Sequence, residues 1–280
     1  TVLVLILSTS RKLGICTWFY LDPPYIEFFK PCIIECICIT LYAYTSNKFN
    51  SHFCKENMKN NNFEKFQFNL DYAIKKLQNL PQSEKTDEVS VPLYLHRNFF
   101  VRNIFINRFK KAFMMTEFSQ KQVLDYGCGS GMFLHALSNE IKNGIGVDLD
   151  IDVASKVISA NNITLKQIKH ESEISYLSNI DIITSFDVLE HIENLDSVFD
   201  TFEKILSKDG IILISGPTEN FFYRLARMIT RFGVKGNLLG EKEHVTDIIK
   251  IKNKMLGRGY KIEKNVNLWN LFHVTSFSLN

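Results

Sequence analysis

The spacing of apolar side chains along the chain changes near residue 120. Between residues 63 and 80 they recur at helical intervals, and Pro81 closes that segment. A second helical pattern, rich in aromatic and basic side chains, follows over residues 93–118. We therefore predict a helix over 63–80, a polar loop over 82–90 and a long helix over 93–118, with the helices packing on a core and turning a basic face to solvent.

After residue 120, short apolar runs alternate with amphipathic stretches. The apolar runs, which we predict to be strands, occupy residues 123–125, 145–148, 165–168, 181–186 and 211–215. The amphipathic stretches, which we predict to be helices, occupy residues 132–141, 151–160 and 195–206. Such alternation is typical of an α/β fold with a parallel sheet wrapped by helices. Residues 246–256 predict a last helix, and residues 260–262 and 268–277 predict two closing strands.

The first 57 residues differ in composition from the rest. This extension holds most of the six cysteines of the chain, Cys16, Cys32, Cys36, Cys38 and Cys54. Charged residues and prolines interrupt its apolar runs, so none reaches the roughly 20 residues of a membrane-spanning helix. We expect either a loose membrane anchor or a segment outside the natural protein, since Met58 opens a stretch that resembles a bacterial N-terminus. The chain then divides into this extension (1–57), a helical region (58–119) and a ligand-binding domain (120–280).

Composition and charge narrow the class of protein only slightly. The 280 residues are 45% hydrophobic and 22% charged, with a formal net charge of +3, as expected of a soluble globular protein. No long basic block argues for a nucleic-acid partner. The cysteines form no C-x-x-C pair and no histidine cluster accompanies them, so we expect no metal site. Because no signal peptide is recognisable, we expect a reducing, cytoplasmic setting.

The clearest chemical signal lies in residues 123–131. An apolar strand ends in Asp125, and Gly127, Gly129 and Gly131 follow at every second position before the helix predicted over 132–141. Glycine lets the loop turn sharply and lets a ligand approach the backbone. Since the first N–H groups of a helix have no partner within it, we expect a ligand to meet the main chain here.

Acidic residues end three of the predicted strands, at Asp125, Asp148 and Asp187. Ligands of parallel sheets bind beyond such strand ends. Asp148 follows Gly131 by somewhat fewer than the roughly 20 residues at which an acid reaches a ribose in nucleotide-binding folds. Its two carboxylate oxygens can accept hydrogen bonds from both ribose hydroxyls. We therefore expect a cofactor that contains a nucleoside.

The spacing of the glycines distinguishes between such cofactors. Dinucleotide enzymes carry G-x-G-x-x-G, whereas this chain has G-x-G-x-G, with Met132 where the last glycine is expected. A pyrophosphate would also be repelled by Asp125. An NAD-dependent oxidoreductase is therefore the weaker alternative, and a cofactor with a positive centre and an ammonium group is favoured.

Four segments of the α/β part follow one another in a recognisable order. They are D-Y-G-C-G-S-G at 125–131, G-V-D-L at 146–149, F-D-V-L-E-H-I at 186–192 and K-D-G-I-I-L-I-S at 208–215. Together they resemble class I S-adenosylmethionine-dependent methyltransferases, in particular the ubiquinone-biosynthesis-like (methyltransferase type 11) branch. The resemblance covers 123–217 by motif and 58–280 more loosely. It implies a Rossmann-like, doubly wound α/β sheet, mostly parallel with an antiparallel last strand, and S-adenosylmethionine as the cofactor.

The same resemblance implies roles for individual residues. The cofactor site that it implies consists of Asp125, Gly127, Gly129, Gly131, Asp148, Leu149, Glu171 and Asp187. Asp125 would hold the methionine ammonium group and Asp148 the ribose hydroxyls, while Leu149 would pack on adenine. Glu171 is a candidate acceptor for the adenine amino group or, equally, a solvated loop acid. Cys128 is expected to fill a tight loop rather than to act as a nucleophile.

Methylation of an oxygen also needs a base. His191 and His244 are the candidates, and a structural role explains either histidine as well. We expect residues 217–245 to form a lid or substrate insertion. Within it, residues 221–232 form a basic amphipathic helix, which fits either a lid with a solvated face or a peripheral membrane contact.

We predict methyl transfer to a small molecule, at an oxygen of a sugar, a lipid-linked sugar or a quinone-like metabolite. The sugars are suggested by G-P-T-E-N at 216–220, which resembles methyltransferases of bacterial surface-polysaccharide synthesis. A protein of the same fold that binds the cofactor without transferring a methyl group is the remaining alternative. Nothing in the sequence indicates the oligomeric state.

Overall fold

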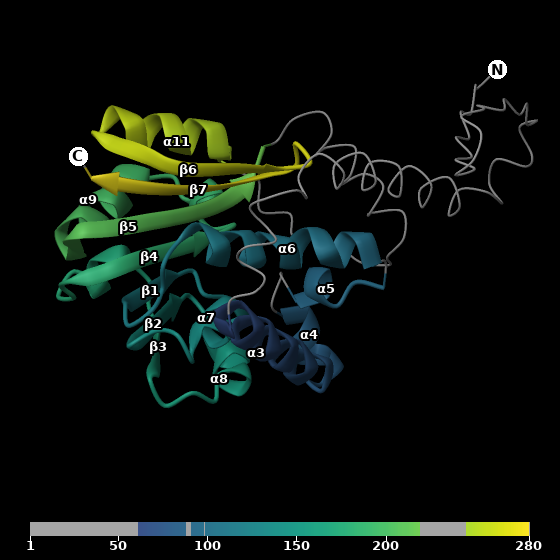
Figure 1. The fold of residues 1–280 in the computed structure, drawn as a ribbon. Coiled ribbons are helices and arrows are strands. Elements are labelled where there is room, and N and C mark those ends of the chain that lie inside the picture. The colour runs from purple at the N-terminus through teal and green to yellow at the C-terminus, as the bar shows by residue number, and fades with distance from the viewer. Residues whose placement is uncertain (1–60, 88–90, 98, 219–244, 280) are drawn as a thin grey trace, which may run out of the picture. The chain divides into compact units, whose positions relative to one another are not determined.

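A single twisted sheet forms the centre of the computed structural model, which describes residues 61–87, 91–97, 99–218 and 245–279 (Figure 1). The extension predicted over 1–57, the helix predicted over 221–232 and His244 lie outside these residues. The seven strands are β1 (Gln122–Tyr126), β2 (Asn143–Asp148), β3 (Ile163–Gln167), β4 (Ile180–Phe186), β5 (Leu206–Pro217), β6 (Tyr260–Leu268) and β7 (Phe272–Leu279).

The order of the strands is β3-β2-β1-β4-β5-β7-β6. The pairs formed among β1 to β5 are parallel, whereas β7 runs antiparallel to both of its neighbours, β5 and β6. Because these strands are parallel, the carboxyl ends of β1, β2 and β4 lie along one edge, and the strand order reverses between β1 and β4. This confirms the predicted doubly wound sheet with an antiparallel last strand.

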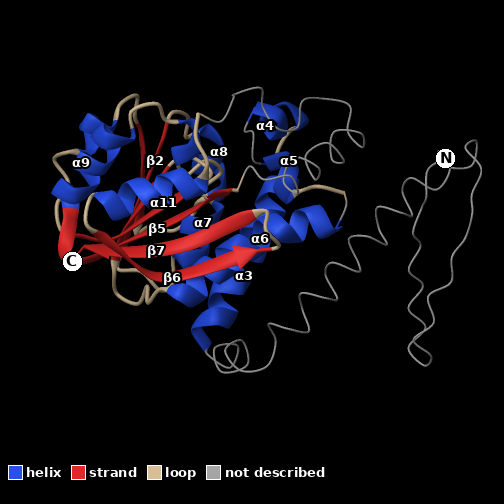
Figure 2. Ribbon diagram, turned by 90° about the horizontal axis from the view of Figure 1, so that it is seen from above, coloured by secondary structure: helices blue, strands red, loops and turns tan. Residues whose placement is uncertain are grey.

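Helices lie on both sides of the strands (Figure 2). They are α3 (Asn61–Gln78), α4 (Gln82–Asp87), α5 (Val91–Tyr94), α6 (Phe99–Met115), α7 (Met132–Leu137), α8 (Asp152–Val157), α9 (Leu195–Ile205) and α11 (Ile248–Gly257). Two short 3-10 helices, η2 (Glu171–Ile174) and η3 (Leu189–His191), follow β3 and β4.

Successive residues of the central strands enter two separate cores, because side chains of a strand alternate between its faces. Val123 packs in one core with side chains of α3, α6 and α7, including Phe66 and Phe133. Leu124 packs in the other core with side chains of α9 and α11, including Phe202. The N-terminal helices are therefore part of the same hydrophobic core as the sheet, and they bring their polar residues to its edge.

Two predictions for the helical region were wrong. The segment 82–90, expected to be a loop, contains α4, and the long helix expected over 93–118 is divided into α5 and α6. At the break, the Leu95 amide still bonds back to Val91 over 3.0 Å, but the carbonyl oxygen of His96 lies 3.5 Å from Nη1 of Arg102. The helix that contains Val91 therefore does not continue through residues 95–97, and α6 begins separately at Phe99.

Candidate functional site

The glycine loop joins β1 to α7 and is fixed by the neighbouring strand. The amides of Gly127 and Cys128 both donate to the carbonyl oxygen of Val147, over 2.8 and 3.0 Å. Gly127, Gly129 and Gly131 have φ values of 75°, 49° and 71°, a region that side chains disfavour. A Cβ atom on Gly127 would also lie 2.1 Å from Cγ2 of Val188. Gly127 therefore also makes room for the side chain of Val188. The sequence had indicated only that glycine here lets a ligand approach the backbone.

Asp148 ties the loop after β2 to the glycine loop. Its Oδ2 accepts a hydrogen bond from the Gly129 amide over 2.7 Å, and its Oδ1 accepts one from the Leu149 amide over 2.6 Å. The Leu149 carbonyl is held in turn by Nε2 of Gln167 over 2.6 Å. The Leu149 side chain is 61% exposed, although it is apolar. The Asp148 carboxylate, which these hydrogen bonds hold in one orientation, and the exposed apolar side chain of Leu149 are therefore neighbours at this edge of the sheet.

Asp125 is buried at the end of β1. It is 2% exposed, and its Oδ1 accepts a hydrogen bond from Oγ1 of Thr184 on β4 over 2.6 Å. Burial raises the pKa of Asp125 to about 7, although the Thr184 hydrogen bond acts in the opposite direction. Near neutral pH this carboxyl group can therefore gain or lose a proton when a charged ligand arrives.

Asp187, the first residue after β4, pairs with Arg108 of α6. Both carboxylate oxygens of Asp187 accept from Nη1 of Arg108. The Arg108 side chain is 0% exposed, and its guanidinium carbon lies 4.7 Å from the ring centroid of Phe105 and 4.4 Å from that of Phe272. Burial lowers the pKa of Arg108, but pairing with Asp187 outweighs it and leaves the pKa raised. Among the residues that the structure describes, Nε and Nη2 of Arg108 have no hydrogen-bond partner.

Glu171 and His191 come from the two 3-10 helices. The Glu171 carboxylate accepts a hydrogen bond from Oγ of Ser197 on α9, which lowers the pKa of Glu171. His191 is an exposed residue of η3, and the neighbouring Glu190 is 1% exposed. The Glu190 carbonyl accepts from the amide of Val245 over 2.8 Å, which anchors the chain where it returns to the sheet.

Cys128 is buried in the glycine loop, and its Sγ would lie 3.1 Å from a Cβ atom placed on Gly146. This packing agrees with the expected role as a loop filler. Within the described part of the chain, no group of three metal-ligating side chains comes together. The helices described here also include none with the length and apolar character needed to cross a membrane.

Sequence reasoning missed three residues of this edge: Arg108, Thr184 and Ser197. Arg108 belongs to the basic set that we expected on a solvated helix face, and that expectation was wrong for this residue. Thr184 could have been identified from the sequence, because it is a hydroxyl residue within an otherwise apolar strand. Ser197 lies 26 residues from Glu171, and nothing in the local sequence relates the two.

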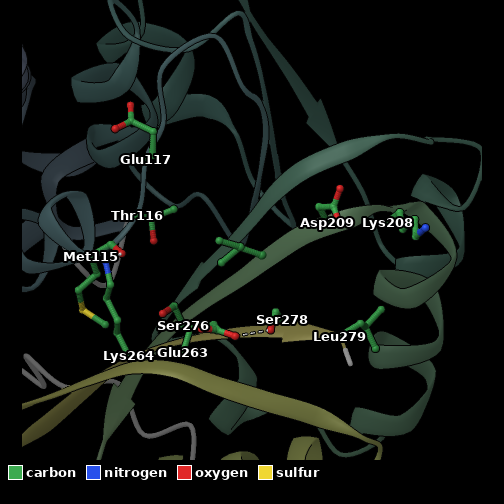
Figure 3. A pocket seen from close by; sticks show the side chains of 11 residues that line it. Met115, Thr116, Glu117, Lys208, Asp209, Glu263, Lys264, Ser276, Ser278 and Leu279 are labelled. Atoms are coloured by element: carbon green, nitrogen blue, oxygen red, sulfur yellow. Dashed lines mark hydrogen bonds between the residues drawn. The ribbon is translucent and has the colours of Figure 1, made fainter.

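An open groove of about 450 Å³ lies apart from the residues described above (Figure 3). It is lined by Thr116, by Asp209 near the start of β5, and by Glu263 and Ser278 of the antiparallel strands. None of the described site residues lines it. The groove is therefore distinct from the edge that carries Asp125, Asp148 and Asp187.

Comparison with known proteins agrees with this geometry. A family model described as a methyltransferase domain matches residues 97–263, more than half of the chain. A ubiquinone biosynthesis O-methyltransferase of Glaesserella parasuis is 30% identical over 105 residues, which cover 34% of this chain and 44% of that protein. One from Rickettsia bellii is 30% identical over 128 residues, covering 43% and 52%. The matched segments thus span about half the length of these relatives.

Solved structures share the fold. The N-methyltransferase NodS of Bradyrhizobium japonicum, in complex with S-adenosylhomocysteine, has a TM-score of 0.52 at 14% identity, covering 70% of this chain and 97% of that one. A methyltransferase of Aquifex aeolicus dependent on S-adenosylmethionine has a TM-score of 0.50 at 14% identity, covering 64% and 93%. With the family match, the sheet order and the four motifs, the chain belongs to the methyltransferase-domain family and shares the fold and motifs of class I S-adenosylmethionine-dependent methyltransferases.

Proposed function

We propose that this enzyme transfers the methyl group of S-adenosylmethionine to an oxygen of a small molecule, either a quinone-like metabolite or a free or lipid-linked sugar. The observation that carries the proposal is the set of polar groups along one sheet edge, Asp148, Asp125 and Arg108, which suits the ribose hydroxyls, the ammonium group and the carboxylate of this cofactor. The curated relatives that match the chain are named as O-methyltransferases of ubiquinone biosynthesis, which supports oxygen as the accepting atom.

Asp148 would bind the ribose. Its Oδ2 accepts one backbone hydrogen bond, from Gly129, and its Oδ1 accepts two, from Leu149 over 2.6 Å and from Asp150 over 3.4 Å. A carboxylate has about four acceptor positions in all, so Oδ2 retains a position for one ribose hydroxyl, and the second hydroxyl would replace the long bond from Asp150 at Oδ1. The exposed Leu149 side chain lies next to them and would pack on the adenine ring. Glu171 is the candidate for the adenine amino group, and Ser197 holds its carboxylate in place.

The methionine end of the cofactor would lie between Asp125 and Arg108. A cationic ammonium group stabilises the ionised form of Asp125, whose pKa of about 7 in the free protein reflects burial. The two unpartnered donors of Arg108, Nε and Nη2, form one edge of the guanidinium group. That edge matches a carboxylate in bidentate geometry, so these buried donors fit the remaining polar group of the methionine part.

The bound cofactor supplies a methyl group already activated by a positive sulfur. The residues of this chain then have to align the acceptor, exclude water and remove one proton. His191 follows β4 at the edge that carries Asp187, and it is exposed. We assign the acceptance of the hydroxyl proton to His191 or to His244, whose ring nitrogens suit proton transfer near neutral pH.

Incubation with S-adenosylmethionine that carries a labelled methyl group tests this function. The enzyme is mixed with extracts of bacteria that make ubiquinone and surface polysaccharide, and the labelled product is identified by mass spectrometry. We expect the label on an oxygen of a quinone precursor or of a sugar, and much less product from the Asp148→Asn variant at a limiting concentration of the cofactor. Label on nitrogen or carbon would contradict O-methylation, and binding of S-adenosylhomocysteine without any labelled product would favour a protein that has lost transfer.

A further inference from the structure

We propose that Asp187 is a positioning residue that acts through Arg108. In this assignment, which rests on the proposed function, Asp187 does not contact the cofactor but fixes the guanidinium group that binds the cofactor's carboxylate. The observation is the distribution of hydrogen bonds around Arg108. Asp187 contacts Nη1 alone, whereas Nε and Nη2 are buried and have no partner within the described part of the chain.

The main chain of Asp187 makes it a rigid support. Its φ is 57°, a conformation that non-glycine residues adopt only where the surroundings impose it. Its amide donates to the carbonyl oxygen of Ser215 over 2.9 Å, which ties the residue to the end of β5. The carboxylate therefore leaves the sheet in a fixed direction, toward α6.

Arg108 needs such a support because it belongs to helix α6, whereas Asp187 follows strand β4 of the sheet. An arginine side chain has many rotamers, and ordering it costs conformational entropy. The rings of Phe105 and Phe272, with centroids 4.7 and 4.4 Å from the guanidinium carbon, restrict the plane of the group. They do not set its rotation within that plane. The contact of Asp187 with Nη1 sets this rotation and leaves the edge formed by Nε and Nη2 for a ligand.

Charge explains why Asp187 supports the site instead of binding the methionine carboxylate itself. Two carboxylates repel each other unless a cation lies between them. Arg108 is that cation, with Asp187 on one nitrogen and the opposite edge available. In this arrangement, removing the charge of Asp187 loosens the guanidinium group and weakens binding of the ligand carboxylate, while binding of the nucleoside part is unaffected.

Two ligands that differ in this carboxylate test the proposal. S-adenosylhomocysteine contains the amino-acid part, and methylthioadenosine lacks it. Calorimetry is carried out on the full chain, on Asp187→Asn, on Arg108→Met and on the double variant. We expect Asp187→Asn to weaken S-adenosylhomocysteine binding about tenfold, a coupling within the usual range for residues in contact, and to leave methylthioadenosine binding unchanged. In the Arg108→Met background, Asp187→Asn should cause no further loss.

Control variants separate this role from general destabilisation. Asp196→Asn removes the acid of an exposed ion pair with Lys254 and should not change binding of either ligand. Arg108→Lys keeps the charge but loses the planar edge of the guanidinium group, so it should weaken S-adenosylhomocysteine binding at an unchanged melting temperature. If Arg108→Met does not fold, Arg108→Lys takes its place in the double-mutant cycle. Additive losses, or equal losses for both ligands, would overturn the positioning role. Failure of the unaltered chain to bind S-adenosylhomocysteine would instead overturn the proposed cofactor site.

Discussion

Thr184 and Asp125 form a hydrogen bond of 2.6 Å between paired positions of β4 and β1. The bond is made inside the protein, since Asp125 is 2% and Thr184 0% exposed. A hydroxyl donor favours the charged carboxylate, but burial has the larger effect and raises the pKa of Asp125 to about 7. The charge of this acid is therefore set by pH within the physiological range.

The first prediction concerns the pH dependence of cofactor binding. If Asp125 binds the ammonium group, it must be ionised in the complex, so the affinity for S-adenosylhomocysteine should rise between about pH 6 and 8 and level off above. Calorimetry in two buffers of different ionisation enthalpy should show proton release at pH 6.5. Asp125→Asn should bind weakly and release no proton, and a flat pH profile in the unaltered chain would contradict this role.

The stability of the free protein should depend on the same acid in the opposite direction. The folded-state pKa of Asp125, about 7, lies above its ordinary value of 3.8. The contribution of this group to stability is therefore fully present below about pH 4 and is lost as pH rises to about 7. We expect Asp125→Asn to raise the melting temperature relative to the unaltered chain at pH 8 more than at pH 5. Differential scanning calorimetry at both pH values measures the change.

Gly127 should be more sensitive to substitution than a glycine with a similar backbone in open space. Gly127→Ala combines a positive φ with a Cβ contact of 2.1 Å to Val188, so we expect a loss of about 3 kcal/mol in the free energy of unfolding. Gly259 has a φ of +92° and no atom within 4 Å of an added Cβ, and Gly259→Ala should cost only about 1 kcal/mol. Urea denaturation compares the two, and similar losses would show that the clash with Val188 is relieved.

Asp148 should affect binding far more than its neighbour Asp150. Asp148→Asn removes the charge that would accept the ribose hydroxyls, and we expect affinity for S-adenosylhomocysteine to fall by about tenfold to a hundredfold, as for hydrogen bonds to a charged group. Asp150→Asn is the matched control, because the Asp150 carboxylate accepts from the Asp152 amide over 2.8 Å and Asp150 contacts Asp148 through its main-chain amide, which the substitution keeps. Retained affinity in Asp148→Asn would mean that the ribose lies elsewhere.

Arg258 should contribute to stability without affecting the cofactor site. It joins the end of α11 to α9, with Nε donating to Glu203 over 2.8 Å and Nη1 to Asp196 over 3.3 Å. We expect Arg258→Met to lower the free energy of unfolding by about 1 kcal/mol, less at high salt, as is usual for partly exposed ion pairs. S-adenosylhomocysteine binding should not change, and a weaker complex would show coupling between this helix pair and the sheet edge.

The periodic parts of the fold were predictable from sequence, but several ends were not. β5 begins at Leu206, five residues before the predicted start at Ile211, because the polar residues Lys208 and Asp209 hide its first half. α7 ends at Leu137, earlier than the predicted 141. There the Asn162 side chain donates to the carbonyl oxygens of Ser138 and Ile141, over 2.9 and 3.1 Å, and such a distant cap leaves no local pattern.

The residues of the candidate site likewise fall into those that the sequence predicted and those that it did not. Asp125, Asp148 and the glycines belong to one continuous motif region, so their spacing alone indicated a nucleoside cofactor. Arg108 and Asp187 are 79 residues apart, and the sequence contains no periodicity that relates them. Their pairing depends on how α6 packs on the sheet, to which aromatic contacts such as Phe109 with Phe186 of β4, at 5.3 Å between ring centroids, contribute.

The position of β7 constrains the order in which the sheet is completed during synthesis. β6 precedes β7 in the chain, yet its neighbour in the sheet is β7, which lies between β6 and β5. When residues 260–268 leave the ribosome they therefore have no strand to join. They must wait for residues 272–279, form a hairpin with them and dock onto β5 as a pair. Until then the edge of β5 is open, so a chain stalled between β6 and β7 should be recognised by chaperones and prone to aggregation.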